Sequence, residues 1–171
     1  VGRDPKDGQE LLSINGLDGA IGLVQSGVLE IHPWGAMLAD IERPDLLTFD
    51  LDPGEAVSWQ AVIAAAGDVC RRVEALGLAA FVKTSGGKGL HVVVPLLPDA
   101  DWGAAKAFCR GVAEAMAADD PDRYIARATK AARRGHIFVD YLRNGRGATA
   151  VAPYSPRARD GAPVSMPVAW E

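Results

Sequence analysis

The sequence has little cysteine and no long apolar segment, and both shortages narrow the class of protein. Its two cysteines, Cys70 and Cys109, fall in helical patterns without the spacing of a disulfide framework or a metal site. We therefore expect two reduced core thiols in a cytosolic protein. No apolar run approaches the roughly 20 residues that span a bilayer, and the polar start lacks the apolar region of a signal peptide. An initiator methionine is also absent, which leaves two interpretations, a fragment or a processed chain.

Positive charge is scarce overall but concentrated in one stretch. The net charge of −4 argues against indiscriminate nucleic-acid binding. Half of the 18 lysine and arginine residues nevertheless lie between residues 123 and 159, where Asp140 is the only acid. This basic stretch comprises Arg123, Arg127, Lys130, Arg133, Arg134, Arg143, Arg146, Arg157 and Arg159. Such a concentration indicates a local anionic ligand, with phosphate the leading candidate, the alternative being a solvated basic face.

The order of helical and strand patterns predicts one α+β domain. A chain of 171 residues can hold one domain with its own core, and no repeat or low-complexity linker divides it. Ser58 and Asp101 are the expected N-caps of the two longer helices. We expect helices at 17–27, 58–78 and 101–120, strands at 28–35, 46–52, 79–84, 90–96, 136–142 and 148–154, and an irregular Pro-rich tail. Short strands joined by tight turns favour a largely antiparallel sheet with helices on one face.

Acidic residues interrupt two of the predicted apolar strands. Asp50 and Asp52 are two residues apart, so their side chains point to the same face of the strand. Adjacent carboxylates are costly unless a cation neutralises them, and Mg²⁺ or Mn²⁺ prefers such oxygen ligands. Asp140 lies near the end of the second strand. If the two strands are neighbours, the three acids form one cluster that holds two metals for phosphoryl or nucleotidyl transfer. Alternatively, one of Asp50 and Asp52 caps the following turn and the other is solvated. For Asp140, the alternative is an acid on an edge strand that faces water.

A glycine-rich turn precedes a strand histidine. The segment SGGKG, residues 85–89, joins two predicted strands in a hairpin-like turn. Its glycines permit close approach of a phosphate to the backbone, while Ser85 and Lys88 add a hydroxyl group and a positive charge. The pattern is not a P-loop, because the required spacing fails and no helix follows. His91, on the next strand, is either a structural residue or a donor to a triphosphate oxygen.

Further candidates come from the basic stretch and from one other histidine. Arg143 follows the second apolar strand closely, and Arg157 and Arg159 lie in the segment YSPRAR. Arginine pairs bidentately with phosphate, and the alternative for each of these arginines is a solvated surface residue. His32 either faces the site or packs against Trp34.

Two other protein classes share parts of this pattern. Haloacid-dehalogenase-type phosphatases also carry two acids after a strand, and Asp119–Asp120 offers their later acidic pair, but here that pair ends a helix. An RNA-recognition module explains the segment RGHIFVDY, residues 134–141, which matches part of the aromatic strand motif of that fold. It leaves the three acids without a role. A catalytically silent nucleotide- or nucleic-acid-binding module of this type is our second hypothesis.

Five long motifs, in order, resemble one family. They are EIHPWGA, TFDLDPG, VKTSGGKGLHVVVPL, IFVDYLRNGRGATAVAPYSPRA and GAPVSMPVAW. Together they are similar to the polymerase domain of bacterial ATP-dependent DNA ligase D, in the archaeo-eukaryotic primase superfamily. The resemblance runs from about residue 14 to the end of the chain. It implies an α+β fold with a mostly antiparallel, RNA-recognition-like sheet packed with helices.

The resemblance also implies an activity. The expected enzyme is a two-metal nucleotidyltransferase, a polymerase or primase that adds nucleotides, preferably ribonucleotides, to DNA 3′ ends in non-homologous end joining. Its cofactors would be two divalent cations, Mn²⁺ or Mg²⁺, and its substrate a nucleoside triphosphate. The expected partners are DNA ends, Ku, and ligase and nuclease modules. No membrane is expected, and the implied location is the bacterial cytoplasm, associated with the nucleoid.

The resemblance finally assigns residues and domain content. The catalytic and metal-binding residues it implies are Asp50, Asp52 and Asp140. The nucleotide-binding residues it implies are His91, Ser85, Lys88, Arg143, Arg157 and His32. The family domain is longer and has an N-terminal portion that grips DNA. We therefore expect residues 1–171 to form a single domain, the core of a primase-polymerase domain without that portion.

Overall fold

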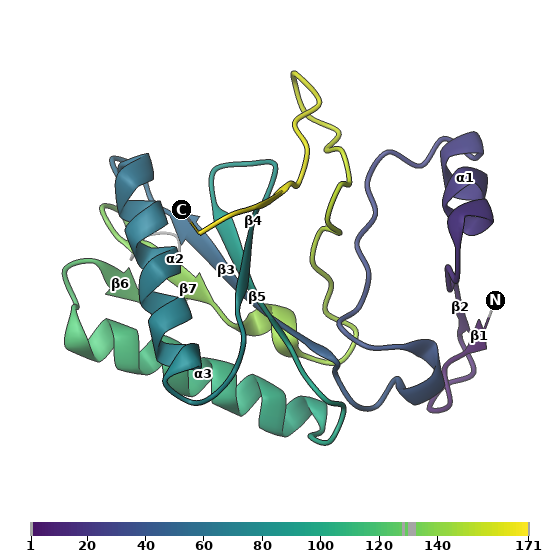
Figure 1. Ribbon diagram of the computed structural model, residues 1–171, viewed down its shortest axis with the longest axis horizontal. Coiled ribbons are helices and arrows are strands. Elements are labelled where there is room, and N and C mark those ends of the chain that lie inside the picture. The colour runs from purple at the N-terminus through teal and green to yellow at the C-terminus, as the bar shows by residue number, and fades with distance from the viewer. Residues whose placement is uncertain (1, 128, 130–132, 171) are drawn as a thin grey trace.

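A mixed sheet organises the chain. The computed structural model describes residues 2–127, 129 and 133–170 (Figure 1). Within these residues, one sheet has six strands in the order β6 (Tyr124–Ile125), β7 (Ile137–Asp140), β3 (Leu46–Pro53), β5 (Leu90–Pro95), β4 (Phe81–Thr84) and β8 (Pro167–Val168). Neighbouring strands are antiparallel except for the parallel pair β6–β7. The predicted α+β class with a mostly antiparallel sheet is confirmed.

Two long helices pack on this sheet. They are α2 (Trp59–Glu74) and α3 (Trp102–Asp119). Both predicted N-caps are present, because the side chains of Ser58 and Asp101 accept hydrogen bonds from backbone N–H groups in the first turn of each helix. Cys70 and Cys109 are free thiols buried in these two helices. Among the helices that the structure describes, none is long and apolar enough to cross a membrane.

Alternation along the strands separates an apolar face from a polar face. Leu47, Phe49 and Leu51 of β3 join the core that α2 and α3 cover. Phe49 and Leu51 are fully buried, and complete burial of such a side chain contributes about 1.5–3 kcal/mol. The intervening residues of β3, which include Asp50 and Asp52, must then project from the other side. We call this side the polar face of the sheet.

The N-terminal segment lies beside the sheet rather than in it (Figure 1). It contains β1 (Gly2–Arg3), β2 (Glu10–Leu11), α1 (Leu17–Gln25) and the 3₁₀ turn η1 (Leu38–Asp40). The helix predicted at 17–27 is therefore confirmed, and α1 has no buried residue. Arg146 connects this segment to the rest of the chain. Its guanidinium lies 2.7 Å from carboxylate oxygens of both Asp4 and Glu42.

Two predicted strands are wrong, although both segments are extended. Residues 28–35 and 148–154 do not enter the sheet but run beside each other (Figure 1). The amide of Ala152 donates to the carbonyl of Ile31 at 2.8 Å, and a second such bond links Ala150 to Pro33. Proline has no N–H to continue a ladder, and each segment contains one. The chain after β7 forms the 3₁₀ turn η3 (Leu142–Asn144).

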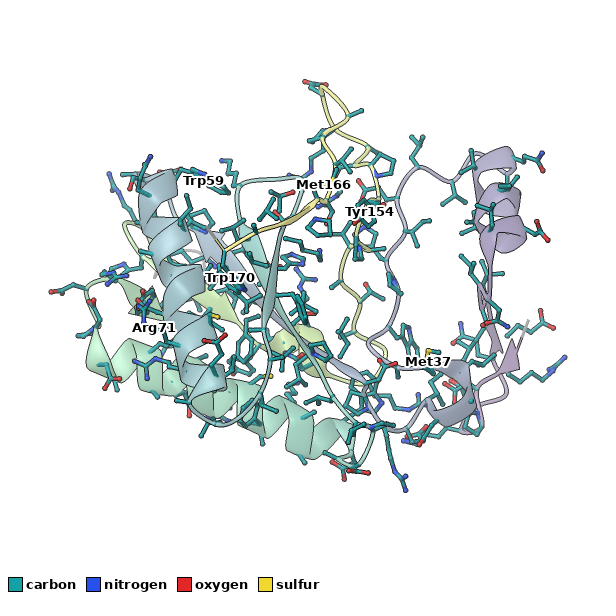
Figure 2. The ribbon with its side chains drawn as sticks, viewed as in Figure 1. Met37, Trp59, Arg71, Tyr154, Met166 and Trp170 are labelled. Atoms are coloured by element: carbon teal, nitrogen blue, oxygen red, sulfur yellow. The ribbon has the colours of Figure 1, made fainter. Side chains whose placement is uncertain are left out.

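The C-terminal tail is more ordered than predicted. Its residues Pro167 and Val168 form β8 and pair with β4 at the edge of the sheet. Trp170 follows, and its indole N–H donates to the carbonyl of Ala80 at 3.0 Å (Figure 2). The prediction of an irregular tail is thus wrong for these residues.

Candidate metal centre and anion pocket

The three predicted acids meet on the polar face of the sheet. Asp50 and Asp52 lie on β3, and the antiparallel register places Asp140 of β7 directly opposite Asp50. One carboxylate oxygen from each of the three lies within 4.8 Å of the others. Asp50 and Asp140 are buried, and Asp52 is half-buried. An all-carboxylate donor set is what hard divalent cations prefer, so these residues fit Mg²⁺ or Mn²⁺.

Two arginines offset the charge of this cluster. The Nε of Arg143 donates to Oδ2 of Asp50 at 3.2 Å and lies 3.5 Å from Oδ2 of Asp140. Arg133 reaches Asp52 from the other side at 3.0 Å, and its guanidinium stacks over the Phe138 ring at 4.5 Å from the centroid. Guanidinium groups therefore bring positive charge next to all three carboxylates.

The three carboxyl groups differ in their proton affinity. Burial, followed by the charge of Asp50, raises the pKa of Asp52. Burial also raises the pKa of Asp140, and the other two acids add to this shift. Burial acts in the same direction on Asp50, but hydrogen bonds from His91 and Arg143 and the charge of Arg143 outweigh it, so the pKa of Asp50 is lowered. Two of the three groups thus lack full compensation of their negative charge, which favours a bound cation.

A row of polar side chains continues from the acids across the sheet. On β5, His91 lies opposite Asp50, with 3.4 Å between Nε2 and Oδ1. On β4, Lys83 lies opposite His91, with 3.0 Å between Nζ and Nδ1. Residue-by-residue reasoning missed Lys83. The available signal was the SGGKG hairpin, because pairing its two strands from the turn outward sets Lys83 beside His91.

The glycine-rich turn needs its glycines for close approach. A Cβ added at Gly89 would lie 2.1 Å from the carbonyl oxygen of Leu51, and Gly86 has a φ of +64°. The Ser85 hydroxyl donates to the Gly89 carbonyl at 2.9 Å and accepts from the amides of Gly87 and Gly89. The prediction for Ser85 was a contact with phosphate. In this structure its hydroxyl group holds the conformation of the turn.

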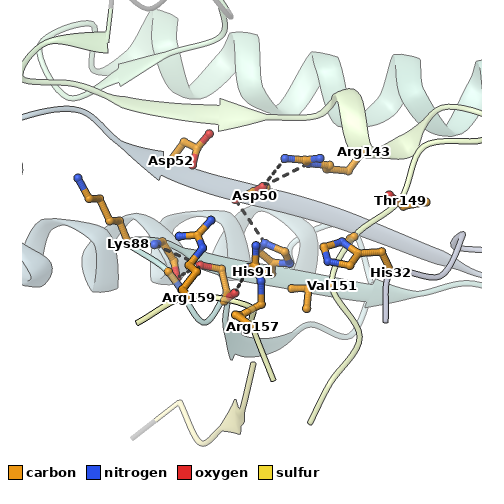
Figure 3. A pocket seen from close by; sticks show the side chains of 14 residues that line it. His32, Asp50, Asp52, Lys88, His91, Arg143, Thr149, Val151, Arg157 and Arg159 are labelled. Carbon is orange, nitrogen blue, oxygen red and sulfur yellow. Dashed lines mark hydrogen bonds and ion pairs between the residues drawn. The ribbon is translucent and has the colours of Figure 1, made fainter. Parts of the chain in front are cut away.

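One cavity of about 230 Å³ gathers most of the predicted residues (Figure 3). The predicted residues that line it are His32, Asp50, Asp52, Ser85, Lys88, His91, Arg143 and Arg157. Asp140 is in the acid cluster but does not line the cavity. Thr149 and Val151 also line it, and the sequence reasoning did not assign them. Acids at one end and basic groups at the other give the cavity two chemically different halves, one for cations and one for an anion.

A glutamate that the sequence reasoning missed holds part of the basic half. Glu30 accepts hydrogen bonds from His32 Nε2 at 2.6 Å and from Arg157 Nε at 3.0 Å. The bond from His32, then the Ala158 amide and Arg157, lower the pKa of Glu30 to about 2. Arg157 also donates to the Ser85 carbonyl at 2.5 Å. Glu30 thereby joins two predicted nucleotide-binding residues that lie far apart in the sequence.

The basic stretch only partly converges on the cavity. Arg143, Arg157 and Arg159 line it, and Arg133 reaches the neighbouring acid. The others that can be placed are elsewhere. Arg123 pairs with Asp68 and Asp120, Arg146 pairs with the N-terminal segment, and Arg127 and Arg134 are exposed. Lys130 lies outside the described residues. The phosphatase-like pair Asp119–Asp120 does not line the cavity and forms ion pairs with Arg72 and Arg123.

Comparison with known proteins gives one consistent result. A family model described as LigD, primase-polymerase domain, matches residues 2–171. The chain is 46% identical over 158 residues to the multifunctional non-homologous end joining protein LigD of Pseudomonas aeruginosa, covering 92% of this chain and 19% of that protein. It is 34% identical over 160 residues to the LigD of Mycolicibacterium smegmatis, covering 92% and 21% respectively. The chain thus spans about a fifth of the length of the curated relatives it matches.

A solved structure agrees with these matches. The polymerase domain from Mycobacterium tuberculosis ligase D in complex with DNA superposes with a TM-score of 0.82 at 32% sequence identity. The alignment covers 89% of this chain and 56% of that chain. The fold therefore has a counterpart of known structure.

Proposed function

The chain belongs to the LigD primase-polymerase family, and on this premise we propose that it is a nucleotidyltransferase that adds nucleotides to DNA 3′ ends. The main support is the placement of three carboxylates from neighbouring strands beside a cavity with a basic second half. Relatives named for non-homologous end joining, and a solved neighbour bound to DNA, support DNA ends as the acceptor. The proposal includes a preference for ribonucleotides and, in the cell, work with Ku and with ligase and nuclease modules.

Each group of residues has a proposed task. Asp50, Asp52 and Asp140 would hold two divalent cations, Mn²⁺ or Mg²⁺, which when bound supply the positive charge that acidifies a 3′-hydroxyl and stabilises leaving pyrophosphate. The turn at 85–89 and the basic wall would bind the triphosphate. The residues assigned to this task are Ser85, Lys88, His91, Arg143, Arg157 and His32. Their positions along one cavity would align the triphosphate with the acids, and such alignment lowers the barrier of transfer.

Arg143 has a second proposed task at the boundary between the two halves of the cavity. It contacts Asp50 and lies beside Asp140, so its charge favours the ionised form of both buried acids. Arginine binds phosphate oxygens bidentately, so with cations held by the acids the Arg143 guanidinium would be able to pair with the triphosphate. The same side chain would thus serve the empty and the substrate-bound cavity.

Replacement of single acids tests the proposal. Asp50→Ala and Asp140→Ala should abolish primer extension with Mn²⁺ and ribonucleotides while circular dichroism shows a folded chain. Asp122→Ala, at an exposed aspartate away from the cavity, is the matched control and should extend primers normally. Full primer extension by Asp50→Ala would show that the assigned mechanism is wrong.

The second hypothesis, a silent binding module, makes a different prediction in the same assay. Nucleotide binding by the unaltered chain without any incorporation would favour that module. One contact opposes an RNA-recognition role of the usual kind. Such modules stack bases on exposed strand aromatics, but Phe138 on β7 is 1% exposed and lies under Arg133.

A further inference from the structure

Lys83 is a buried cation on the polar face to which the proposed chemistry gives no task. It is 5% exposed and lies on β4, next to His91 in the row that begins at Asp140. We propose that Lys83 is a positioning residue that fixes the tautomer of His91, so that the imidazole presents its Nε2–H to Asp50 and the cavity. This role of Lys83 rests on the proposed function in one respect, because it explains how the His91 ring would be oriented toward a bound triphosphate.

The hydrogen bonds of Lys83 account for all of its donors. An ammonium group has three N–H donors and no acceptor. Nζ lies 2.9 Å from the Val151 carbonyl oxygen, 2.9 Å from Ser165 Oγ and 3.0 Å from His91 Nδ1. The Ser165 hydroxyl donates its own proton to the Thr84 carbonyl at 2.8 Å, so its oxygen is left as an acceptor for Lys83. The third donor of the ammonium therefore points at His91 Nδ1.

This arrangement determines the proton on His91. A ring nitrogen that accepts a hydrogen bond carries no proton, so the neutral imidazole has its proton on Nε2. Nε2 is the nitrogen 3.4 Å from Asp50 Oδ1. The opposite tautomer, or the doubly protonated ring, would direct an N–H at the ammonium and repel it. His91 is only 4% exposed, so water cannot easily replace the lost partner.

The charge state of Lys83 agrees with this assignment. Burial lowers its pKa to about 8, with Asp50 raising it and Arg157 lowering it to smaller extents. At pH 7 the charged form therefore predominates. Figure 3 shows His91 between Asp50 and Val151, the residue whose carbonyl also receives a donor from Lys83. The Lys83 ammonium thus fixes the position of the ring proton on His91 and also binds the backbone of Val151, which lines the cavity.

Nitrogen-15 NMR of the histidine rings tests the tautomer directly. The chain has three histidines, His32, His91 and His136, and His91→Gln identifies the signals of the ring in question. In the metal-free wild-type chain at pH 7, we expect His91 to carry its proton on Nε2. The variant Lys83→Met replaces the ammonium group with an apolar side chain of similar length. In this variant we expect His91 to show a mixture of tautomers or the Nδ1–H form. Lys106→Met, at an exposed lysine on α3, should leave the spectrum unchanged.

The outcomes decide the inference even if one variant fails to fold. A proton on Nδ1 in the wild-type chain overturns it without any variant. An unchanged Nε2–H form in folded Lys83→Met overturns it as well. Ser165→Ala keeps the contact between Lys83 and His91 but removes another partner of the ammonium. It should retain the wild-type tautomer, which separates positioning of the ring from general support of the fold.

Nucleotide binding gives a second readout. Loss of the hydrogen-bond partner of a metal-ligating histidine costs about 10- to 100-fold in affinity or activity, and by analogy Lys83→Met should weaken binding of Mn²⁺–ATP by about 10-fold or more. Lys106→Met should bind as wild type does. The two proposals fail separately. A wild-type chain that never adds nucleotides overturns the proposed function, while the ring spectra alone decide the role of Lys83.

Discussion

Replacing Asn144 with leucine should destabilise the chain more than an ordinary surface change. Asn144 is 1% exposed and lies in η3, beside the end of the β7–β3 ladder at Asp50 and Asp140. Its Oδ1 accepts from the Thr48 amide at 2.8 Å, and its Nδ2 donates to the carbonyls of Thr48 and Tyr141, each at 2.9 Å. The ladder with β7 ends at Asp50, so the amide side chain takes the place of a strand partner for Thr48.

The expected magnitude follows from these three hydrogen bonds. Each is worth about 0.5–1.5 kcal/mol, and loss of all three gives roughly 3 kcal/mol, since the amide and carbonyl of Thr48 are left buried without these partners. Leucine branches at the same atom as asparagine, so Asn144→Leu removes the bonds without opening a large cavity. Urea unfolding should show a lower midpoint with an unchanged slope. Asn15→Leu, at an exposed asparagine, is the control and should change the free energy of unfolding by less than about 0.5 kcal/mol.

The result also bears on the site, because Asn144 follows Arg143 directly. If the amide is what holds η3 against β3, Asn144→Leu should weaken the contact of Arg143 with Asp50 and slow nucleotide addition. A loss of less than 1 kcal/mol in the free energy of unfolding, far below the roughly 3 kcal/mol expected from three bonds, would refute the reasoning. It would mean that water or another group satisfies Thr48.

The remaining predictions concern charge in the acid cluster and space in the glycine-rich turn. In EDTA at pH 7, Asp140→Asn should raise the melting temperature and Asp50→Asn should lower it. Burial and like charge raise the pKa of Asp140, so its ionised form destabilises the fold above that pKa. At Asp50, burial is outweighed by basic neighbours and the pKa is lowered, so the ionised form stabilises the fold. That stabilisation is lost as the pH falls through the pKa of Asp50. The opposite order of melting temperatures would contradict the assigned charges. Gly89→Ala should lose about 1–3 kcal/mol in urea unfolding because its Cβ would lie 2.1 Å from Leu51 O, whereas Gly111→Ala, in open space on α3, should gain up to about 1 kcal/mol. Equal effects of the two alanines would show that the turn has room.

Much of the fold was predictable because local rules and packing agree. The alternation in LLTFDLDPG sends apolar side chains to the helices and both acids to the other face, whatever the neighbouring strands are. Ser58 and Asp101 cap helices whose apolar stripes need this sheet. The acid cluster itself needed one further fact, that β3 and β7 are neighbours, which spacing alone does not give.

The errors arise where long-range pairing decides. The segments at 28–35 and 148–154 have strand composition, but they form hydrogen bonds with each other outside the sheet. Each contains a proline, which has no N–H to donate to a strand ladder. Glu30 was not assigned, because the contact that joins it to Arg157 forms only after folding. The two residues of β8 pair with β4 through a contact more than 80 residues distant in sequence, which no local pattern encodes.

The order of charges along the polar row explains why a buried lysine does not disable the acids. Asp50 raises the pKa of Lys83, so the two groups attract each other. If they were adjacent, the ammonium would form a direct ion pair and compete with any cation for the carboxylate. The register instead places His91 between them, with Nδ1 of the ring toward the Lys83 ammonium and Nε2 toward Asp50. Lys83 therefore lowers the electrostatic cost of burying the acid without forming a direct ion pair with it.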